Sequence, residues 1–227
     1  MSMRKYFESF EVVEVQKTFY KPVSLETAKK WRKMAPENFE FCVKAFQVIT
    51  HPPSSPTYKK AKLDFKNGGF FKPTEEVFKA WELTKNVANA LKAKIILFQT
   101  PKSFKECEEN VKNMREFFNS INSYTFVWEP RGWSEKAIKN LCAELNLVHC
   151  VDPFVAKPLH GRINYFRLHG SHKRMYKHKY SKDELIWLKE FCKAYEKDTY
   201  VLFNNIYMKD DARTFKKLLT CQAHNGQ

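Results

Sequence analysis

Seven short apolar segments alternate with helix-like segments along the whole chain, and no other feature constrains the fold as tightly. The apolar segments are continuous runs rich in β-branched and aromatic residues, which are typical of parallel strands buried on both faces. Strands that alternate with helices predict a parallel sheet covered by helices. The predicted strands cover residues 10–15, 39–46, 95–101, 124–131, 147–153, 163–168 and 199–205.

Hydroxyl residues followed by acidic residues mark the starts of several predicted helices. Ser103 with Glu106, and Ser181 with Glu184, each fit a capping box, in which the two side chains bond to each other's backbone amides. The segment 52–73 is rich in Pro, Gly and Lys and is predicted to be irregular, either as a functional loop or as a plain surface excursion. The predicted helices cover residues 25–34, 74–92, 103–118, 134–146, 181–195 and 210–219, and residues 2–9 could form one or two helical turns.

Polar or charged residues end nearly every predicted strand. The segment that begins at Ile163 is apolar at first and then ends in Arg167, His169 and Gly170. In a TIM-type barrel the carboxyl ends of all strands meet at one mouth, so this repeated pattern favours such a barrel over an open sheet. No GxGxxG and no GxxxxGK[ST] motif follows the first strands, which disfavours dinucleotide-binding and P-loop folds. We therefore predict a single α/β domain, a TIM-type (β/α) barrel with seven strands over residues 1–227.

The formal net charge of +15 indicates an anionic partner, with nucleic acid as the first candidate. A solvated, Lys-rich surface is the alternative explanation. The six cysteines include no CxxC pair, so they predict small buried side chains in a reducing compartment rather than a metal centre. The chain has no apolar leader at its start and no 18-residue apolar run. It is therefore expected to be cytoplasmic and to have no membrane partner.

The charged and amide residues at the strand ends are the candidate site. Glu129 and Arg131 are two residues apart on one strand and should face the same side. Such charges cannot be buried unpaired, so they must form a salt-bridge network, bind a metal or meet a polar ligand. The catalytic candidates are the groups that could move a proton: Glu14, His51, Glu129, Asp152 and His169. The substrate-binding candidates are Tyr20, Lys44, Gln99, Arg131, Arg167 and Asn204.

A bound metal is an open alternative at this site. The carboxylates and histidines among the catalytic candidates are acceptable ligands for a divalent ion. The sequence has no HxH, HExxH or DxD run, so no metal ligand is assigned and the cofactor stays unknown. His149 lies within an apolar strand and is predicted to be a core histidine rather than a ligand.

Residues 154–182 contain no Asp or Glu, but they hold eight Lys or Arg residues and four of the seven histidines. Aromatic residues are interleaved with these cations, so the segment could bind a phosphate backbone and stack bases. A solvated loop whose aromatic rings merely pack is the alternative. The nucleic-acid-binding candidates are Lys173, Arg174, Lys177 and Lys179.

Several short boxes of the chain together resemble one known family. The segment Glu14–Tyr20, EVQKTFY, is similar to a VE-[IV]-N-S-T-F-Y box. Other boxes follow in the family's order at residues 39–44, 50–51, 99–101, 129–131, 152, 167–170 and 204–205. On these residues the chain resembles the domain of unknown function 72 (DUF72), the family of the YecE-like proteins, over about residues 8–215. The resemblance implies a TIM-type barrel with a polar mouth and no particular reaction.

The chain departs from the family's pattern at two points. Gln16 stands where the family box has Asn. Family members also begin with a strand that carries a Gly-Thr-Ser/Cys-Gly-Trp/Tyr motif, and this chain starts too late to include it. Either the barrel is open at its N-terminal edge, or another element fills the gap, or the chain start is truncated. An uncovered strand edge favours association, so a homodimer that hides it is a candidate assembly.

These observations lead to a functional hypothesis with two alternatives. We expect an enzyme that acts on an anionic, phosphate-bearing substrate, either a small molecule or a nucleic acid, by acid–base chemistry at the barrel mouth. Phosphodiester hydrolysis fits the charge of the chain best. The alternatives are a nucleic-acid-binding protein without catalysis and a ligand-sensing, partly degenerate family member.

Overall fold

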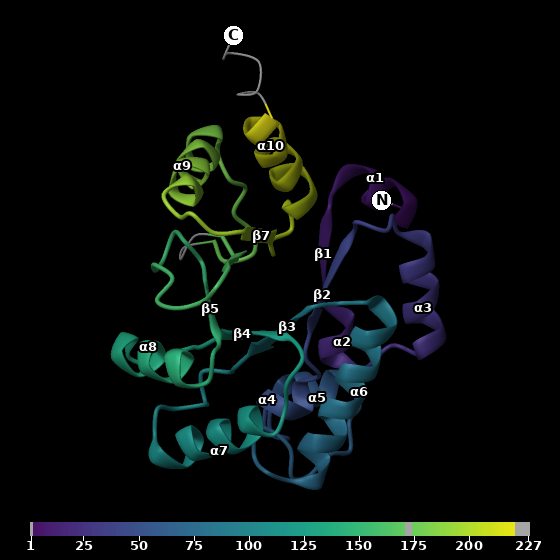
Figure 1. The fold of residues 1–227 in the computed structure, drawn as a ribbon, viewed down its shortest axis with the longest axis vertical. Helices are drawn as coiled ribbons and strands as arrows, with labels where there is room; N and C mark the ends of the chain where they lie inside the picture. Colours follow the sequence, from purple (N-terminus) through teal and green to yellow (C-terminus); the bar gives the residue numbers. More distant parts are fainter. Residues whose placement is uncertain (1, 171–173, 221–227) are drawn as a thin grey trace. The chain divides into compact units, whose positions relative to one another are not determined.

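The fold is built on seven parallel strands in the sequential order β1-β2-β3-β4-β5-β6-β7. The structure, a computed structural model, describes residues 2–170 and 174–220 (Figure 1). Contacts divide the chain into two compact units, Met1–His149 and Cys150–Gln227. The strands are β1 Val12–Val15, β2 Glu40–Lys44, β3 Ile95–Gln99, β4 Thr125–Glu129, β5 Val148–Val151, β6 Asn164–Leu168 and β7 Thr199–Phe203.

Helices follow the strands in turn. The helices are α1 Met3–Ser9, α2 Lys17–Tyr20, α3 Leu25–Met34, α4 Gln47–Thr50, α5 Pro56–Ala61, α6 Glu75–Leu91, α7 Glu108–Asn119, α8 Glu135–Glu144, α9 Lys182–Lys193 and α10 Met208–Thr220. Every predicted strand is present, and the parallel, sequential order confirms the predicted TIM-type fold class with seven strands. The prediction of a single domain stays a prediction.

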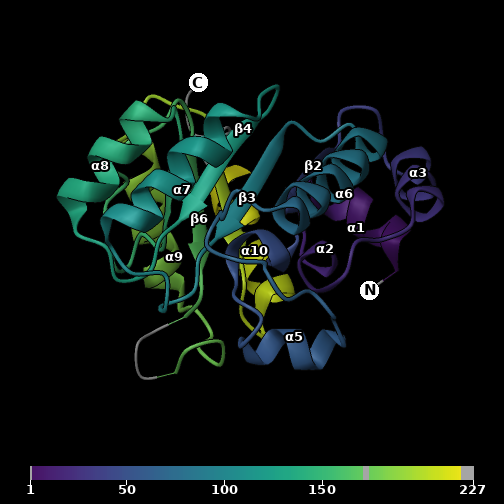
Figure 2. The ribbon, with the colours of Figure 1, turned by 90° about the horizontal axis from the view of Figure 1, so that it is seen from below.

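Unit 1 is organised around an aromatic core between strands and helices. Its helices α3 and α6 lie side by side, and α6 packs against β2 (Figure 2). Phe98 on β3 points to the helical side, where its ring lies 5.7 Å from that of Phe117 on α7. Phe71 is fully buried and contacts both of these rings and that of Phe118. This cluster accounts for part of the high Phe content of the chain.

In unit 2 the helices α9 and α10 lie next to each other (Figure 1). The core of the unit joins Phe166 and Leu168 of β6 to Leu185 and Leu188 of α9 and to Phe215 of α10. Alternate residues of β6 therefore face the helices. Arg167, between them, lies on the opposite face of the strand.

Helix α1 precedes β1 at the point where the family pattern has its motif-bearing strand. Its Phe7 packs 4.8 Å from the ring of Phe39 and 6.2 Å from that of Phe41, at the start of β2. Tyr6 donates a hydrogen bond to the carbonyl of Val12, and burial raises its pKa to about 12. The segment ahead of β1 is thus an aromatic helix anchored to β2. A homodimer that covers a sheet edge stays a prediction.

The capping box at Ser103 and Glu106 is wrong. Helix α7 begins at Glu108, after Cys107, whose side chain makes no capping hydrogen bond. The carboxylate of Glu106 instead accepts from the backbone N–H of Ser134 at 2.8 Å and from its hydroxyl at 3.1 Å. Glu106 therefore bonds to Ser134, which is distant in the sequence, and not to the start of its own helix as the local pattern predicted.

Three short helices also lie outside the prediction. α5 forms inside the segment that was predicted to be irregular, with Pro56 in its first turn. Four-residue helices α2 and α4 directly follow β1 and β2. Helices this short depend on tertiary packing rather than on a sequence pattern, and so periodicity did not indicate them.

The cysteines mostly follow the prediction. Cys42, Cys142 and Cys150 are buried and reduced, and burial raises the pKa of Cys142 to about 12. Cys192 is half-buried, and Cys221 lies outside the described residues. Cys107 is exposed, which corrects the prediction for that residue. It occupies the N-cap position of α7 at the surface, without a capping bond from its side chain, instead of filling a core position.

Replacing Ser181 by alanine should lower the free energy of unfolding by about 1 kcal/mol. The predicted capping box is present: Ser181 and Glu184 each bond to the other's backbone amide at the start of α9. Urea denaturation followed by circular dichroism measures the change. Ser181→Asn, which keeps a capping oxygen, is the matched control and should lose much less; equal losses in both variants would contradict the assignment.

Candidate functional site

Five of the seven predicted residues of unit 1 gather at the carboxyl ends of β2, β3 and β4. Lys44 is in register with Leu97, and Gln99 with Glu129. Because Leu97 and Gln99 are two residues apart on one strand, Lys44, Gln99 and Glu129 share one face of the sheet. The structure therefore brings these three side chains to one face, and the roles predicted for them stay predictions.

A continuous polar chain joins four of these side chains. The Lys44 Nζ donates to Gln99 Oε1 at 2.8 Å, and Gln99 Nε2 donates to Glu129 Oε1 at 2.6 Å. Arg131 Nη2 lies 3.6 Å from the same Glu129 oxygen. We name this set, Lys44, Gln99, Glu129 and Arg131, the strand-end cluster. It carries two positive charges and one negative charge.

Two members of the strand-end cluster are buried charges. Lys44 is 6% exposed and Glu129 is 7% exposed. The Lys44 ammonium also lies 4.1 Å from the centre of the Phe19 ring, in a cation–π contact. Lys44 therefore points into a polar site instead of extending to solvent. Removing either charge from such a buried site carries a stability cost, so folding has to be measured beside activity in variants of Lys44 and Glu129.

His51 lies within the electrostatic reach of this cluster. It is buried, its Nδ1 lies 2.8 Å from the hydroxyl of Thr50, and its ring packs edge-on to Phe19. Burial, followed by the positive charges of Lys44 and Arg131, lowers the pKa of His51 to about 3. The imidazole is therefore neutral at neutral pH and holds no proton that it could donate as an imidazolium. It can still donate or accept one hydrogen bond, or bind a cation.

Glu14 and Tyr20 lie on the neighbouring strand end. The amide of Gln16 donates to Glu14 Oε1, so the residue that departs from the family box serves a carboxylate of its own chain. Tyr20 is exposed, and the Lys60 ammonium of α5 lies 5.5 Å from its ring centre. These residues add an acidic and an aromatic group beside β1.

Sequence reasoning missed Gln47, which is fully buried in α4. Its Nε2 donates to the carbonyl of Tyr20 at 3.3 Å, and its Oε1 has no hydrogen-bond partner among the described residues. A buried amide oxygen of this kind calls for a partner such as water or a ligand. Its place three residues after a strand was the available signal, and the prediction passed over it to Thr50 and His51.

In unit 2, Asp152 organises the strand ends through backbone contacts. One carboxylate oxygen accepts from the N–H of His169 at 2.9 Å, and the other accepts from the N–H of Phe154 at 3.1 Å. The side chain thus ties the end of β5 to the end of β6. The bond from the His169 N–H gives Asp152 a positioning contact with that histidine.

His169 also meets Asn204, as expected for two neighbouring strand ends. The Asn204 Nδ2 lies 3.2 Å from His169 Nδ1. If the amide nitrogen donates, the neutral ring carries its proton on Nε2. Arg167 is only 1% exposed and ranks among the largest fully buried side chains. The roles assigned to these residues stay predictions.

The nucleic-acid-binding candidates fall on one exposed segment. Arg174, Lys177 and Lys179 are exposed after β6, and Lys173 lies outside the described residues. The backbone N–H of Tyr176 donates to the carbonyl of His169 at 2.6 Å, which ties the segment to the end of β6. The predicted core histidine, His149, is buried, and burial lowers its pKa to about 4.

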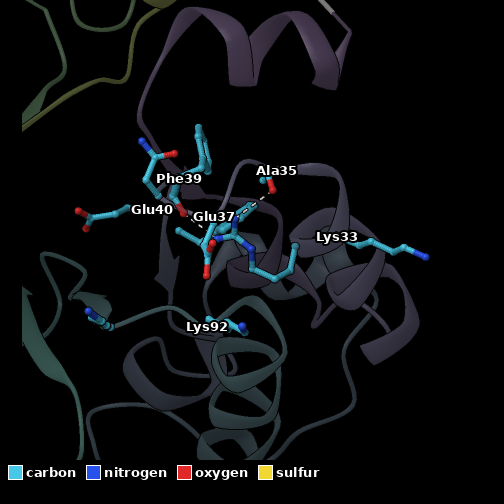
Figure 3. Close-up of a pocket in the computed structure, with 10 residues that line it drawn as sticks. Lys33, Ala35, Glu37, Phe39, Glu40 and Lys92 are labelled. Atoms are coloured by element: carbon cyan, nitrogen blue, oxygen red, sulfur yellow. Dashed lines mark hydrogen bonds between the residues drawn. The ribbon is translucent and has the colours of Figure 1, made fainter.

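A hollow of about 610 Å³ lies at the amino ends of β2 and β3, away from the predicted site (Figure 3). Arg32, which lines it, donates to the carbonyls of Phe39 at 2.6 Å and Ala35 at 3.2 Å and to that of Pro36. Its guanidinium therefore closes the turn between α3 and β2. In TIM-type barrels this end serves stability, and sites lie at the carboxyl ends. We assign the hollow no function.

The described residues contain no group of three or more His, Cys, Asp or Glu side chains placed to hold a metal ion. A divalent metal stays an open alternative at the strand ends, to be tested in solution. Within the same residues, none of the helices has the length and apolarity needed to cross a membrane.

Comparison with known proteins gives one family. The model of the family "Protein of unknown function DUF72" matches residues 2–226. The UPF0759 protein YunF of Bacillus subtilis (strain 168) is 25% identical over 96% of this chain and 85% of its own length. The structure of a DUF72 family protein from Enterococcus faecalis V583 is similar with a TM-score of 0.74 and 19% identity, over 96% of this chain and 88% of that one.

A more distant likeness extends the comparison of folds. A xylose isomerase domain containing protein from Salmonella typhimurium LT2 has a TM-score of 0.57 and 12% identity, over 96% of this chain and 90% of that one. At such low identity the likeness concerns the fold alone.

Proposed function

This chain belongs to the DUF72 family, and we propose that it is an enzyme that acts on an anionic, phosphate-bearing substrate by acid–base chemistry at its strand ends. The observation that carries the proposal is the hydrogen-bonded strand-end cluster, with buried Lys44 and Glu129 joined through Gln99. Three adjacent strands supply its members, at the end of the sheet where barrel enzymes hold their sites.

The charges of the cluster favour an anion. Lys44 and Arg131 are positive and Glu129 is negative, while His51 is neutral at neutral pH because its pKa is about 3. The excess positive charge lies partly buried, where electrostatic interactions are stronger than in water. A phosphate group could accept from the ammonium and from the planar guanidinium together.

Glu129 is the proposed general base. In hydrolysis of a phosphodiester, a water oxygen bonds to phosphorus and its proton passes to the Glu129 carboxylate. The bond from phosphorus to the leaving oxygen breaks, and that oxygen takes a proton from solvent. Lys44 and Arg131 stabilise the negative charge on the phosphoryl oxygens during this displacement. Gln99 holds the carboxylate in place through its 2.6 Å hydrogen bond.

Purified protein should hydrolyse at least one member of a panel of phosphomonoesters, phosphodiesters and oligonucleotides, assayed with Mg²⁺, with Mn²⁺ and with EDTA. Lys44→Met keeps the side-chain volume and removes the charge, so we expect it to lower kcat/KM about 100-fold. Lys92→Met, an exposed lysine of the same unit, is the control and should keep the wild-type rate.

The absence of turnover across this whole panel would overturn the proposal. It would leave the two alternatives, a nucleic-acid-binding protein without catalysis and a ligand sensor. Both would still bind inorganic phosphate or an oligonucleotide in equilibrium measurements.

A further inference from the structure

Two neighbouring loops of unit 2 expose a group of large apolar side chains at the carboxyl ends of β6 and β7. The loop after β6 exposes Met175 and Tyr176, and the corner after β7 exposes Ile206, Tyr207 and Met208. Tyr176 is 40% exposed and Tyr207 is 37% exposed. Contiguous exposed apolar groups mark interaction sites, whereas single ones do not.

Hydrogen bonds fix the two loops against each other. The N–H of Ile206 donates to the carbonyl of Tyr176 at 2.8 Å, and the Asn205 amide donates to the carbonyl of His178 at 2.7 Å. The same Asn205 amide nitrogen lies 2.6 Å from an oxygen of Asp211, and both of these residues are buried. The exposed side chains therefore stand on a braced support.

Tyr176 is held in a strained conformation. Its φ of +63° lies in the left-handed region, which is unusual for a bulky residue. Its N–H donates to the carbonyl of His169, and its ring stands edge-on to the His169 ring, with centres 5.6 Å apart. Strain that the surrounding contacts maintain is typical of binding and active sites. It keeps an exposed aromatic ring beside a predicted catalytic histidine.

The loops are also strongly positive. Arg174, Lys177, Lys179 and Lys209 are exposed on them. The Lys179 ammonium lies 5.9 Å from the centre of the Tyr207 ring. Asp210, at the start of α10, is the exposed acid on the same corner. Exposed cations on the same loops as exposed aromatic rings match a phosphate backbone that carries bases.

We propose that these two loops form a stacking platform for single-stranded nucleic acid, in which bases lie on Tyr176 and Tyr207 and the four cations hold phosphates. Bases inside a duplex are stacked on each other, so a single strand is the form that can use both rings. An acidic protein segment would match the cations, but it would not need the flat ring faces. This inference rests on the proposed function, whose substrate class it names as single-stranded nucleic acid. The binding itself can be measured without turnover.

Fluorescence anisotropy with three labelled probes of equal length tests the platform: a thymidine oligonucleotide, an abasic deoxyribose-phosphate strand and a duplex. The thymidine strand should bind about 100-fold more tightly than the abasic strand, about tenfold for each of the two rings, because only the former has bases to stack. The affinity for both strands should fall with salt, with a slope of roughly 0.7 for each phosphate contacted.

Tyrosine variants assign the stacking to the platform. Tyr207→Ala should weaken binding of the thymidine strand about tenfold and leave binding of the abasic strand unchanged. Tyr207→Trp, which keeps an aromatic ring, should bind the thymidine strand as the wild type does. Tyr176→Gly relieves the backbone strain and removes the second ring, so it keeps the test informative if one variant folds poorly. Trp187→Leu, an exposed aromatic residue of α9, is the matched control and should have no effect.

Equal affinity for the thymidine and abasic strands, or unchanged binding in both tyrosine variants, would overturn the platform. Preference for the duplex would overturn the assignment to a single strand, and binding of an acidic protein in place of any oligonucleotide would do the same. Base-dependent binding in a protein without phosphoesterase activity would contradict the proposed enzyme and leave the platform intact. Hydrolysis of small phosphodiesters without base-dependent binding would support the proposed enzyme and contradict the platform.

Discussion

Replacing Glu129 by glutamine should lower kcat on the best phosphodiester substrate by about 10²–10⁴-fold, the range that a general base contributes. The substitution preserves the size of the side chain and an oxygen that can still accept from the Gln99 amide. It removes the group that takes the proton from water. Steady-state kinetics at pH 7 would measure the loss, and circular dichroism would show that the fold is kept.

The same variant should bind inorganic phosphate at least as tightly as the wild type. Lys44 and Arg131 keep their positive charges, and the negative charge that repels an anion is gone. Glu82→Gln, at an exposed acid of α6 that pairs with Lys85, is the control and should change neither kcat nor phosphate binding. An unchanged kcat in Glu129→Gln would remove Glu129 from the chemistry. Loss of phosphate binding with loss of folding would instead assign it to the core.

The strands could be predicted from the sequence because each is a continuous apolar run. A continuous apolar run could be a strand or a buried helix, and the helical periodicity of the segments between the runs favours strands. The sequential order of the strands followed from the alternation together with the polar strand ends, which favoured a barrel over an open sheet. Element ends were less certain: β4 stops at Glu129, two residues short of the predicted end, and Arg131 still reaches the Glu129 carboxylate from beyond the strand.

The failures came from partners far away in the chain. Glu106 bonds to Ser134, 28 residues later, and no local pattern contains that information. Asp152 accepts backbone amides with both of its oxygens, a contact that its place at a strand end did not indicate, and its predicted catalytic role stays a prediction. The sequence could show which residue types end each strand. It could not show that Gln99 would link Lys44 to Glu129, since that depends on the register of three strands.

Lowering the pH from 7 to 5 should reduce the free energy of unfolding by roughly 4 kcal/mol through two buried histidines. The pKa of His51 is lowered to about 3, by burial and then by the charges of Lys44 and Arg131. The pKa of His149 is lowered to about 4 by burial, against a smaller opposing effect of Glu129. In the unfolded chain both return to about 6.5.

The sign of the effect follows from which state binds more protons. Between pH 6.5 and about 4, the unfolded chain protonates these histidines and the folded chain keeps them neutral, so protons favour unfolding. The stabilisation is fully present above pH 6.5 and is lost as the pH falls toward the folded pKa values. Each histidine accounts for roughly 2 kcal/mol of the stability lost between pH 7 and pH 5. Ordinary carboxylates are still mostly ionised at pH 5 and add little to this loss.

His149→Phe separates this effect from other acid-linked changes. The variant should lose only about 2 kcal/mol between pH 7 and pH 5, half the loss of the wild type, whatever its stability at pH 7. Urea denaturation at both pH values gives the two differences, so a general destabilisation by the substitution cancels. An equal loss in the wild type and the variant would mean that His149 is protonated in the folded protein.

Bound phosphate should act on the other histidine. Because His51 lies within reach of Lys44 and Arg131, phosphate bound to these cations should raise the pKa of His51. The wild type should then lose less stability between pH 7 and pH 5 with phosphate than without it. The pH dependence of stability with and without phosphate therefore reports directly on the charge of the strand-end cluster.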